Sequence, residues 1–114
     1  MGLGNLFGML KPGAALANAT HDEMRAASAN GGAAIIDVRE PGEYSSGHIP
    51  GAVNLPLSRF DAAKLPQDKP LIFVCASGAR SANAARHVLA QGRTDIKNYA
   101  PGTMGWMRFG EKVV

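Results

Sequence analysis

Two short apolar runs place the strongest limit on what this chain can fold into. Residues 33–38 read Ala-Ala-Ile-Ile-Asp-Val, and residues 71–74 read Leu-Ile-Phe-Val. Residues that favour turns precede each run, Asn-Gly-Gly at 30–32 and Gln-Asp-Lys-Pro at 67–70. A continuous apolar run of roughly four to eight residues is typical of a strand buried on both faces, as in a parallel sheet covered by helices. We therefore expect an α/β protein.

Helical patterns alternate with these strands, as a parallel sheet requires. Thr20-His-Asp-Glu23 has the spacing of a capping box, which predicts a helix from about His21 to Ser28 that ends at Asn30-Gly31-Gly32. The other elements expected are a short helix near Glu43 and Tyr44, a strand at 52–55, a short helix from Ser58 to about Lys64, a helix at 80–91, a strand at 96–99 and a helix at 102–109 that holds Trp106 against the core.

The length and composition fit one globular domain. Two domains would each be too small to bury a core within 114 residues, and the mean hydropathy is −0.07. We expect an apolar N-terminal tail at 1–17 and a folded domain at 18–114. The opening segment lacks the basic residues of a signal peptide, and no apolar run approaches the roughly 18 residues that span a bilayer. A cytoplasmic location is the expectation.

The charged residues argue against several kinds of partner. The net charge is +3, but the basic residues are scattered from Lys11 to Lys112 without forming a run. Nucleic-acid-binding domains usually cluster their charge, so we expect no nucleic-acid partner. The sequence also holds no group of His, Cys or carboxylate residues at metal-ligand spacing, so no metal is expected.

The single cysteine, Cys75, directly follows the second apolar run. Small residues come next (Ala76, Ser77, Gly78 and Ala79), and Arg80 and Ser81 then open a predicted helix. Backbone N–H groups at such a turn, aided by the helix dipole, stabilise an anion, so the pKa of Cys75 should be lowered. Gly78 can adopt a positive φ, Arg80 offers a fork of donors to an oxyanion, and Ser81 can cap the helix or donate. The competing interpretation is an inert, buried cysteine.

Four segments of the sequence occur in an order that resembles the single-domain rhodanese-like sulfurtransferases. They are Ile36-Asp-Val-Arg39, Glu43-Tyr44, Gly47-His-Ile-Pro-Gly-Ala52 and Cys75-Ala-Ser-Gly-Ala-Arg80-Ser81. The resemblance runs from about Thr20 to Gly110. It implies a five-stranded, mostly parallel sheet with helices on both faces.

The resemblance also implies an activity, that of a thiosulfate:cyanide class sulfurtransferase. Cys75 would take a sulfane sulfur from thiosulfate or a persulfide donor, hold it as a covalent persulfide without a further cofactor, and pass it to cyanide, a thiol or a protein acceptor. One alternative is a non-catalytic module of the same fold that docks a partner through its apolar tail. Another is a phosphatase or arsenate reductase, but those relatives place five residues between Cys and Arg, and here Cys75 and Arg80 are separated by four.

The resemblance assigns supporting roles to residues outside the loop. Asp37 and Arg39 leave a strand end beside the site and are expected to form a structural ion pair that braces the loop or the turns. His48 is expected to be a structural hydrogen-bonding residue. Two positions depart from the family pattern: Ala76 stands where many thiosulfate-using members carry a basic or aromatic residue, and Pro101 stands where the first of two glycines usually precedes the tryptophan.

Overall fold

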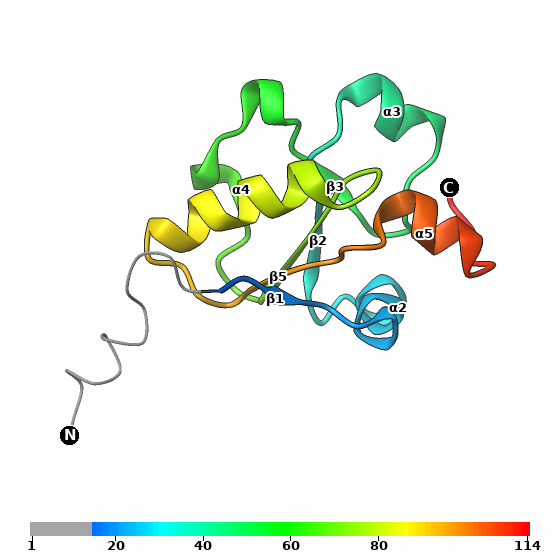
Figure 1. Ribbon diagram of the computed structural model, residues 1–114, viewed down its shortest axis with the longest axis horizontal. Coiled ribbons are helices and arrows are strands. Elements are labelled where there is room, and N and C mark those ends of the chain that lie inside the picture. The colour runs from blue at the N-terminus through cyan, green and yellow to red at the C-terminus, as the bar shows by residue number, and fades with distance from the viewer. Residues whose placement is uncertain (1–14) are drawn as a thin grey trace.

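The computed structural model describes residues 15–114 and shows a five-stranded sheet in the order β1-β5-β4-β2-β3 (Figure 1). All four neighbouring pairs are parallel. The strands are β1 (Ala17–Asn18), β2 (Ala34–Asp37), β3 (Val53–Asn54), β4 (Leu71–Val74) and β5 (Ile96–Asn98). The predicted α/β class and parallel sheet are confirmed. Residues 1–14 of the predicted tail lie outside the described residues, and Ala17 already belongs to β1.

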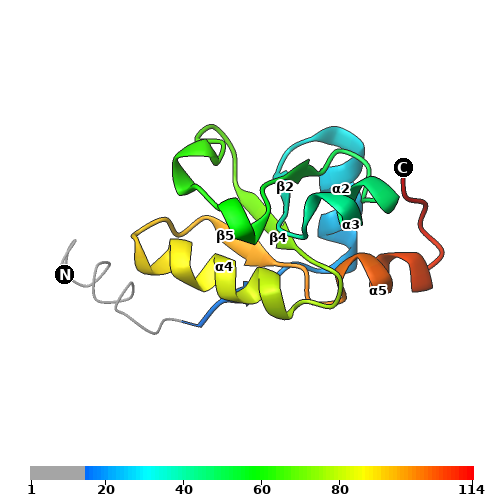
Figure 2. The ribbon, with the colours of Figure 1, turned by 90° about the horizontal axis from the view of Figure 1, so that it is seen from above.

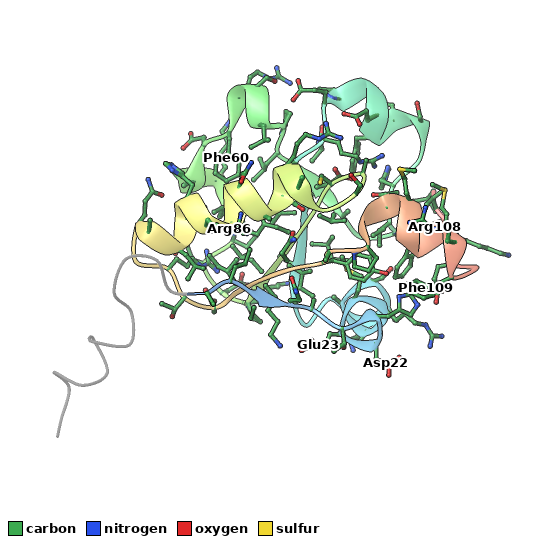
Figure 3. The ribbon with its side chains drawn as sticks, viewed as in Figure 1. Asp22, Glu23, Phe60, Arg86, Arg108 and Phe109 are labelled. Carbon is green, nitrogen blue, oxygen red and sulfur yellow. The ribbon has the colours of Figure 1, made fainter. Side chains whose placement is uncertain are left out.

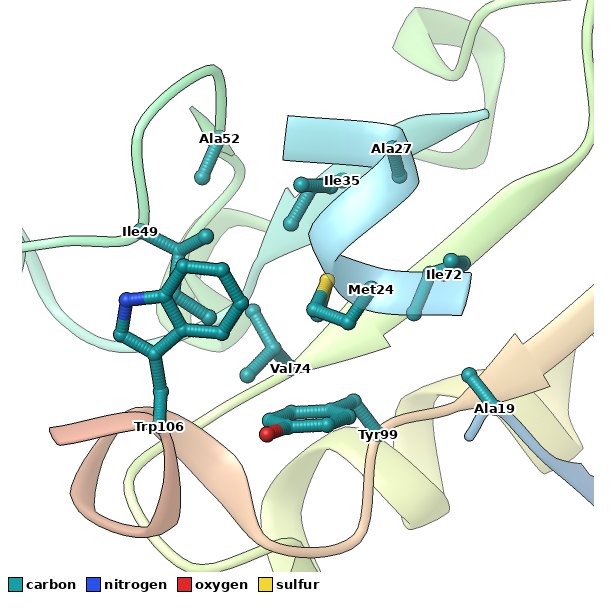
Figure 4. Packing of buried hydrophobic residues seen from close by; sticks show 10 residues of the cluster. All are labelled: Ala19, Met24, Ala27, Ile35, Ile49, Ala52, Ile72, Val74, Tyr99 and Trp106. Atoms are coloured by element: carbon teal, nitrogen blue, oxygen red, sulfur yellow. The ribbon is translucent and has the colours of Figure 1, made fainter. Parts of the chain in front are cut away.

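Helices cover both faces of the sheet, as expected (Figures 1 and 2). They are α2 (His21–Asn30), α3 (Pro41–Ser46), α4 (Ala79–Ala90) and α5 (Gly102–Arg108), with 3-10 turns η1 (Leu57–Arg59) and η2 (Ala62–Lys64). On one face, α2 and α5 bury Met24, Tyr99 and Trp106 in a single cluster (Figure 4). On the other face, α4 packs Ala85 and Val88 against the sheet.

The register of the three central strands brings their carboxyl ends to one edge of the sheet. Phe73 of β4 lies opposite both Ile36 of β2 and Asn98 of β5. Phe73 is fully buried, in keeping with the apolar run that predicted this strand. Val74, the last residue of β4, lies opposite Asp37 of β2, and Cys75 then leaves the sheet between the ends of β2 and β5. In parallel sheets this edge is where ligands bind.

The first helix begins as its sequence predicts. The backbone N–H of Glu23 donates to the Thr20 hydroxyl at 3.0 Å, and the N–H of Thr20 donates to the Glu23 carboxylate at 2.8 Å. This is the reciprocal capping box expected from the spacing. The helix runs to Asn30, two residues beyond the predicted Ser28, and Gly31 of the predicted stop caps it with φ +72°.

The predicted helix from Ser58 to Lys64 is wrong, because two separate 3-10 turns occupy this segment. Phe60, labelled in Figure 3, lies between them in an extended conformation. The centroid of its ring lies 6.3 Å from that of Phe73. This partly buried ring packs against the core, and the helix is interrupted at Phe60. Ser58 caps neither turn and instead donates its hydroxyl to Glu40 at 2.6 Å. Strand β1 was not predicted, because both of its residues are exposed and carry no apolar pattern.

None of the helices between residues 15 and 114 combines the length and apolarity needed to cross a bilayer.

Candidate functional site

The sulfur of Cys75 accepts several hydrogen bonds from the loop that follows β4. The backbone N–H of Gly78 donates to Sγ at 3.1 Å, and the N–H of Ser81 donates at 3.3 Å. The Ser81 hydroxyl lies 3.3 Å from the same sulfur. Cys75 is almost fully buried, with a relative exposure of 1%. The chain thus wraps its own donors around the sulfur, as predicted from the small residues of the loop.

This arrangement favours the thiolate form of Cys75. Burial on its own raises the pKa of the thiol, because it penalises the charged form. The hydroxyl and N–H of Ser81 oppose this effect, together with the N–H groups of Ser77 and Gly78. The balance leaves the pKa of Cys75 below its ordinary value. A lowered pKa makes a cysteine nucleophilic at neutral pH.

The loop is held from outside by the start of α5. The backbone N–H of Thr103 donates to the Cys75 carbonyl at 2.8 Å, and the N–H of Met104 donates to the Ala76 carbonyl at 3.1 Å. Gly102, with φ +70°, allows this approach, since a Cβ placed there would lie 2.2 Å from the Ala76 oxygen. Backbone hydrogen bonds therefore hold the loop against the start of α5. A side chain at residue 102 would push the two segments apart.

Gly78 is pressed equally closely against the segment that leads into α5. It takes φ +97°, as predicted, and a Cβ there would lie 2.4 Å from the Ala100 carbonyl oxygen. Its own carbonyl accepts from the Asn98 side-chain Nδ2 at 3.3 Å. Asn98 is 3% exposed, and its Oδ1 has no hydrogen-bond partner among the described residues. Asn98 thus lies directly beneath the turn that carries the N–H groups.

The guanidinium of Arg80 faces Glu43 of α3. Its Nη1 and Nη2 donate to the two carboxylate oxygens of Glu43 at 2.8 and 2.9 Å. These hydrogen bonds hold the pKa of Glu43 at about 2, so this carboxylate is ionised at neutral pH. The fork predicted for an oxyanion is therefore occupied by a side chain of the protein itself.

The expected ion pair between Asp37 and Arg39 is present at the end of β2. Nη2 and Nε of Arg39 donate to the Asp37 carboxylate at 2.8 to 3.1 Å, and Nη2 also donates to the Gly47 carbonyl. Both side chains are almost fully buried, with exposures of 7% and 0%. The pair ties the end of β2 to the turn that follows α3. It braces this turn and makes no direct contact with the Cys75 sulfur.

The three histidines have structural positions. His48 stacks on Tyr44 at 3.7 Å and bonds its Nδ1 to the Tyr44 carbonyl, in line with the structural role expected for it. His21 lies between the Tyr99 hydroxyl and Glu111, and His87 is exposed on α4. Within residues 15–114, no three His, Cys, Asp or Glu side chains are grouped so as to hold a metal ion.

Sequence reasoning did not assign four of the residues that shape the site: Glu43, Asn98, Gly102 and Thr103. Asn98 carried a usable signal, because a polar residue at the carboxyl end of a buried parallel strand is placed like Asp37 and Cys75. The contacts of the other three depend on how α3 and α5 pack, which no local pattern reveals.

Comparison with known proteins agrees with the geometry. Residues 20–109 match the family described as the rhodanese-like domain. The chain belongs to this family. It is 33% identical over 82 residues to a protein named sulfurtransferase from Allochromatium vinosum, covering 70% of this chain and 77% of that protein.

Two further relatives of this rhodanese-like chain cover most of its length. The human thiosulfate:glutathione sulfurtransferase is 32% identical over 102 residues, which covers 75% of this chain and 88% of the human protein. The crystal structure of a rhodanese-related protein from Thermoplasma volcanium superposes with a TM-score of 0.74 at 30% identity, covering 86% of this chain and 97% of the other.

Proposed function

We propose that this rhodanese-like protein is a sulfurtransferase that carries sulfane sulfur as a persulfide on Cys75. The observation that supports this most directly is the convergence of the Gly78 and Ser81 donors on one buried sulfur. The same donors that stabilise a thiolate also stabilise the terminal sulfur of a persulfide, which is an anion of the same charge. The sulfurtransferase names of relatives support the same activity.

The first step balances without any added oxidant or reductant. The Cys75 thiolate attacks the outer sulfur of thiosulfate or of an organic persulfide, and a new S–S bond forms as the donor's S–S bond breaks. The bonding electron pair leaves with sulfite or with the organic thiolate. The negative charge then lies on the new terminal sulfur, to which the Ser81 hydroxyl and the loop N–H groups can donate.

The burial of Cys75 favours donors whose transferable atom is a single terminal atom that can reach a buried sulfur. A terminal sulfur is a single atom at the end of a bond, whereas phosphate and arsenate present a tetrahedral group. The N–H groups of the loop donate to the cysteine sulfur itself, and the guanidinium of Arg80 is bonded to Glu43. These features support sulfur transfer over phosphoryl transfer.

The second step must deliver the sulfur to another molecule, because Cys75 is the only cysteine in the 114 residues. With no second thiol to form an internal disulfide, an external thiol, cyanide or a protein thiol attacks the terminal sulfur and regenerates the Cys75 thiolate. A reducing compartment such as the cytoplasm would keep this thiol free between turnovers.

The test is mass spectrometry of the intact protein after incubation with a sulfane-sulfur donor. We expect a gain of one sulfur atom that is absent in Cys75→Ser and is reversed by cyanide with release of thiocyanate. No gain with either thiosulfate or a persulfide would refute the proposed function. A Cys75→Ser variant that still gained sulfur would refute the assigned nucleophile.

A further inference from the structure

The charged side chains around the Cys75 loop cancel one another. Arg80 is the only charged residue between Cys75 and Ser81. It is bonded through both terminal nitrogens to Glu43. Arg39 is likewise paired with a carboxylate, donating from Nε and Nη2 to Asp37. The charges of these four side chains sum to zero, so the site carries one net negative charge when Cys75 is a thiolate.

Glu43 is held firmly in this role by its own helix. Its carboxylate also accepts the backbone N–H of Glu40 at 3.1 Å, as the capping-box glutamate of α3. It is therefore anchored to α3 on one side and to Arg80 on the other. Two of the five N–H donors of Arg80 are bonded to Glu43, so an anion that binds to the remaining donors also meets the negative charge of the Glu43 carboxylate.

The consequence differs between the two classes of donor. Thiosulfate brings two negative charges to a site that already carries the thiolate, and sulfite leaves with two. An organic persulfide brings at most one negative charge on its reacting sulfurs and leaves as a thiol. Repulsion grows with the product of the charges, so Glu43 opposes thiosulfate about twice as strongly.

We propose that Glu43 is a specificity-determining residue that makes an organic persulfide, and not the thiosulfate dianion, the preferred sulfur donor. This inference rests on the proposed function and narrows its substrate class. In the transfer, the Cys75 thiolate bonds to the outer sulfur of R–S–SH, the donor S–S bond breaks, and R–S⁻ leaves. The proton of the donor then passes from the new persulfide to the more basic leaving thiolate, giving R–SH and Cys75–S–S⁻.

The experiment measures second-order rate constants for persulfide formation on Cys75, by quenched-flow mass spectrometry. The two probes are thiosulfate and cysteine persulfide, whose ammonium and carboxylate groups cancel. We expect the wild-type protein to react at least about tenfold faster with cysteine persulfide. Glu43→Gln keeps an oxygen acceptor for Arg80 and for the Glu40 N–H but removes the charge. It should raise the thiosulfate constant about tenfold and change the persulfide constant less than about threefold.

A matched control is Glu23→Gln. Glu23 is also the capping-box glutamate of its helix and is also bonded to a cation, but that cation is Lys97 on β5. Its two rate constants should stay within about twofold of the wild type. The increase in the thiosulfate rate constant caused by Glu43→Gln should also shrink as salt is raised from about 0.02 to 0.5 M, because salt screens the repulsion.

The outcomes separate this inference from the proposed function. The donor preference would be overturned if the wild-type rate constants for the two donors were comparable, or if Glu43→Gln did not raise the rate constant for thiosulfate. Either result would leave the proposed sulfurtransferase activity intact. No persulfide from either donor would remove the proposed function itself.

Discussion

Ser81 directs both its backbone N–H and its hydroxyl at the sulfur of Cys75, each at 3.3 Å. A hydrogen bond to a charged group contributes about 1.5 to 3 kcal/mol. Ser81→Ala removes the hydroxyl but keeps the N–H, so we expect the pKa of Cys75 to rise by roughly one unit. Cys75 reacts as a thiolate above its pKa, so the midpoint of the pH-rate profile for alkylation by iodoacetamide should move to higher pH. At a pH below the midpoints of both profiles, the rate should fall about tenfold.

Ser77→Ala is the control for this measurement. Ser77 acts on Cys75 through its backbone N–H, which the substitution retains. Its pH-rate profile should match that of the wild type. A Ser81→Ala profile that also matched the wild type would show that the hydroxyl does not bond to the thiolate.

Asn98 reaches Cys75 indirectly, through the carbonyl of Gly78. That carbonyl lies 3.3 Å from the Asn98 Nδ2 and 3.2 Å from the Ser81 hydroxyl, which has only one proton to donate. Asn98 satisfies one of the two lone pairs of the carbonyl and so weakens its competition with the sulfur for the Ser81 proton. In Asn98→Ala the carbonyl competes more strongly for that proton, and we expect the profile to shift to higher pH, with the alkylation rate below its midpoint falling about threefold.

A merely structural role for Asn98 would give a different result in a double-mutant cycle. If Asn98 acts through the Ser81 hydroxyl, then adding Asn98→Ala to Ser81→Ala should not shift the profile further. Additive shifts in the double variant would contradict this positioning role.

The sequence predicts the parts of this protein that depend on local pattern. The apolar run 71–74 became β4 with the same bounds, and the Thr20 and Glu23 pair formed its capping box. The loop after Cys75 also follows from local chemistry, because small residues before a helix leave N–H groups that point inward. Each of these features is decided within a few residues of the chain.

The features that sequence reasoning missed depend on contacts between distant segments. Arg80 finds Glu43 across 37 positions of the chain, and Asn98 reaches Gly78 across 20. The helix predicted after Ser58 failed for the same reason, since packing of the partly buried Phe60 against Phe73 outweighed the local propensity. A fork of donors can be recognised in a sequence, but which anion occupies it is decided by packing.

Gly102 and Gly110 both take positive φ, at +70° and +89°, but only Gly102 is crowded. A Cβ at Gly102 would meet the Ala76 carbonyl, whereas a Cβ at Gly110 has nothing within 4 Å. We expect Gly110→Ala to lower the free energy of unfolding by about 1 to 2 kcal/mol, the cost of the left-handed backbone alone. Gly102→Ala should cost roughly 2 kcal/mol more and should slow Cys75 alkylation at least about tenfold. Urea denaturation and alkylation measure the two effects, and equal behaviour of the variants would contradict the role of Gly102.

The Asp37–Arg39 pair and the Arg93–Asp95 pair have the same spacing along the chain but opposite exposure. Asp37 is fully buried, whereas the Asp95 side chain is 48% exposed and bonds to Arg93 at 2.7 Å. Asp37→Asn leaves the Arg39 charge buried without its counter-ion, so we expect the free energy of unfolding to fall by about 3 to 5 kcal/mol. Asp95→Asn disturbs a pair that water already screens, and should cost less than about 1 kcal/mol. Urea denaturation at neutral pH compares the two variants. Similar losses in both would show that burial does not set the contribution of the Asp37 pair, and that the turn after α3 is held by its backbone bonds alone.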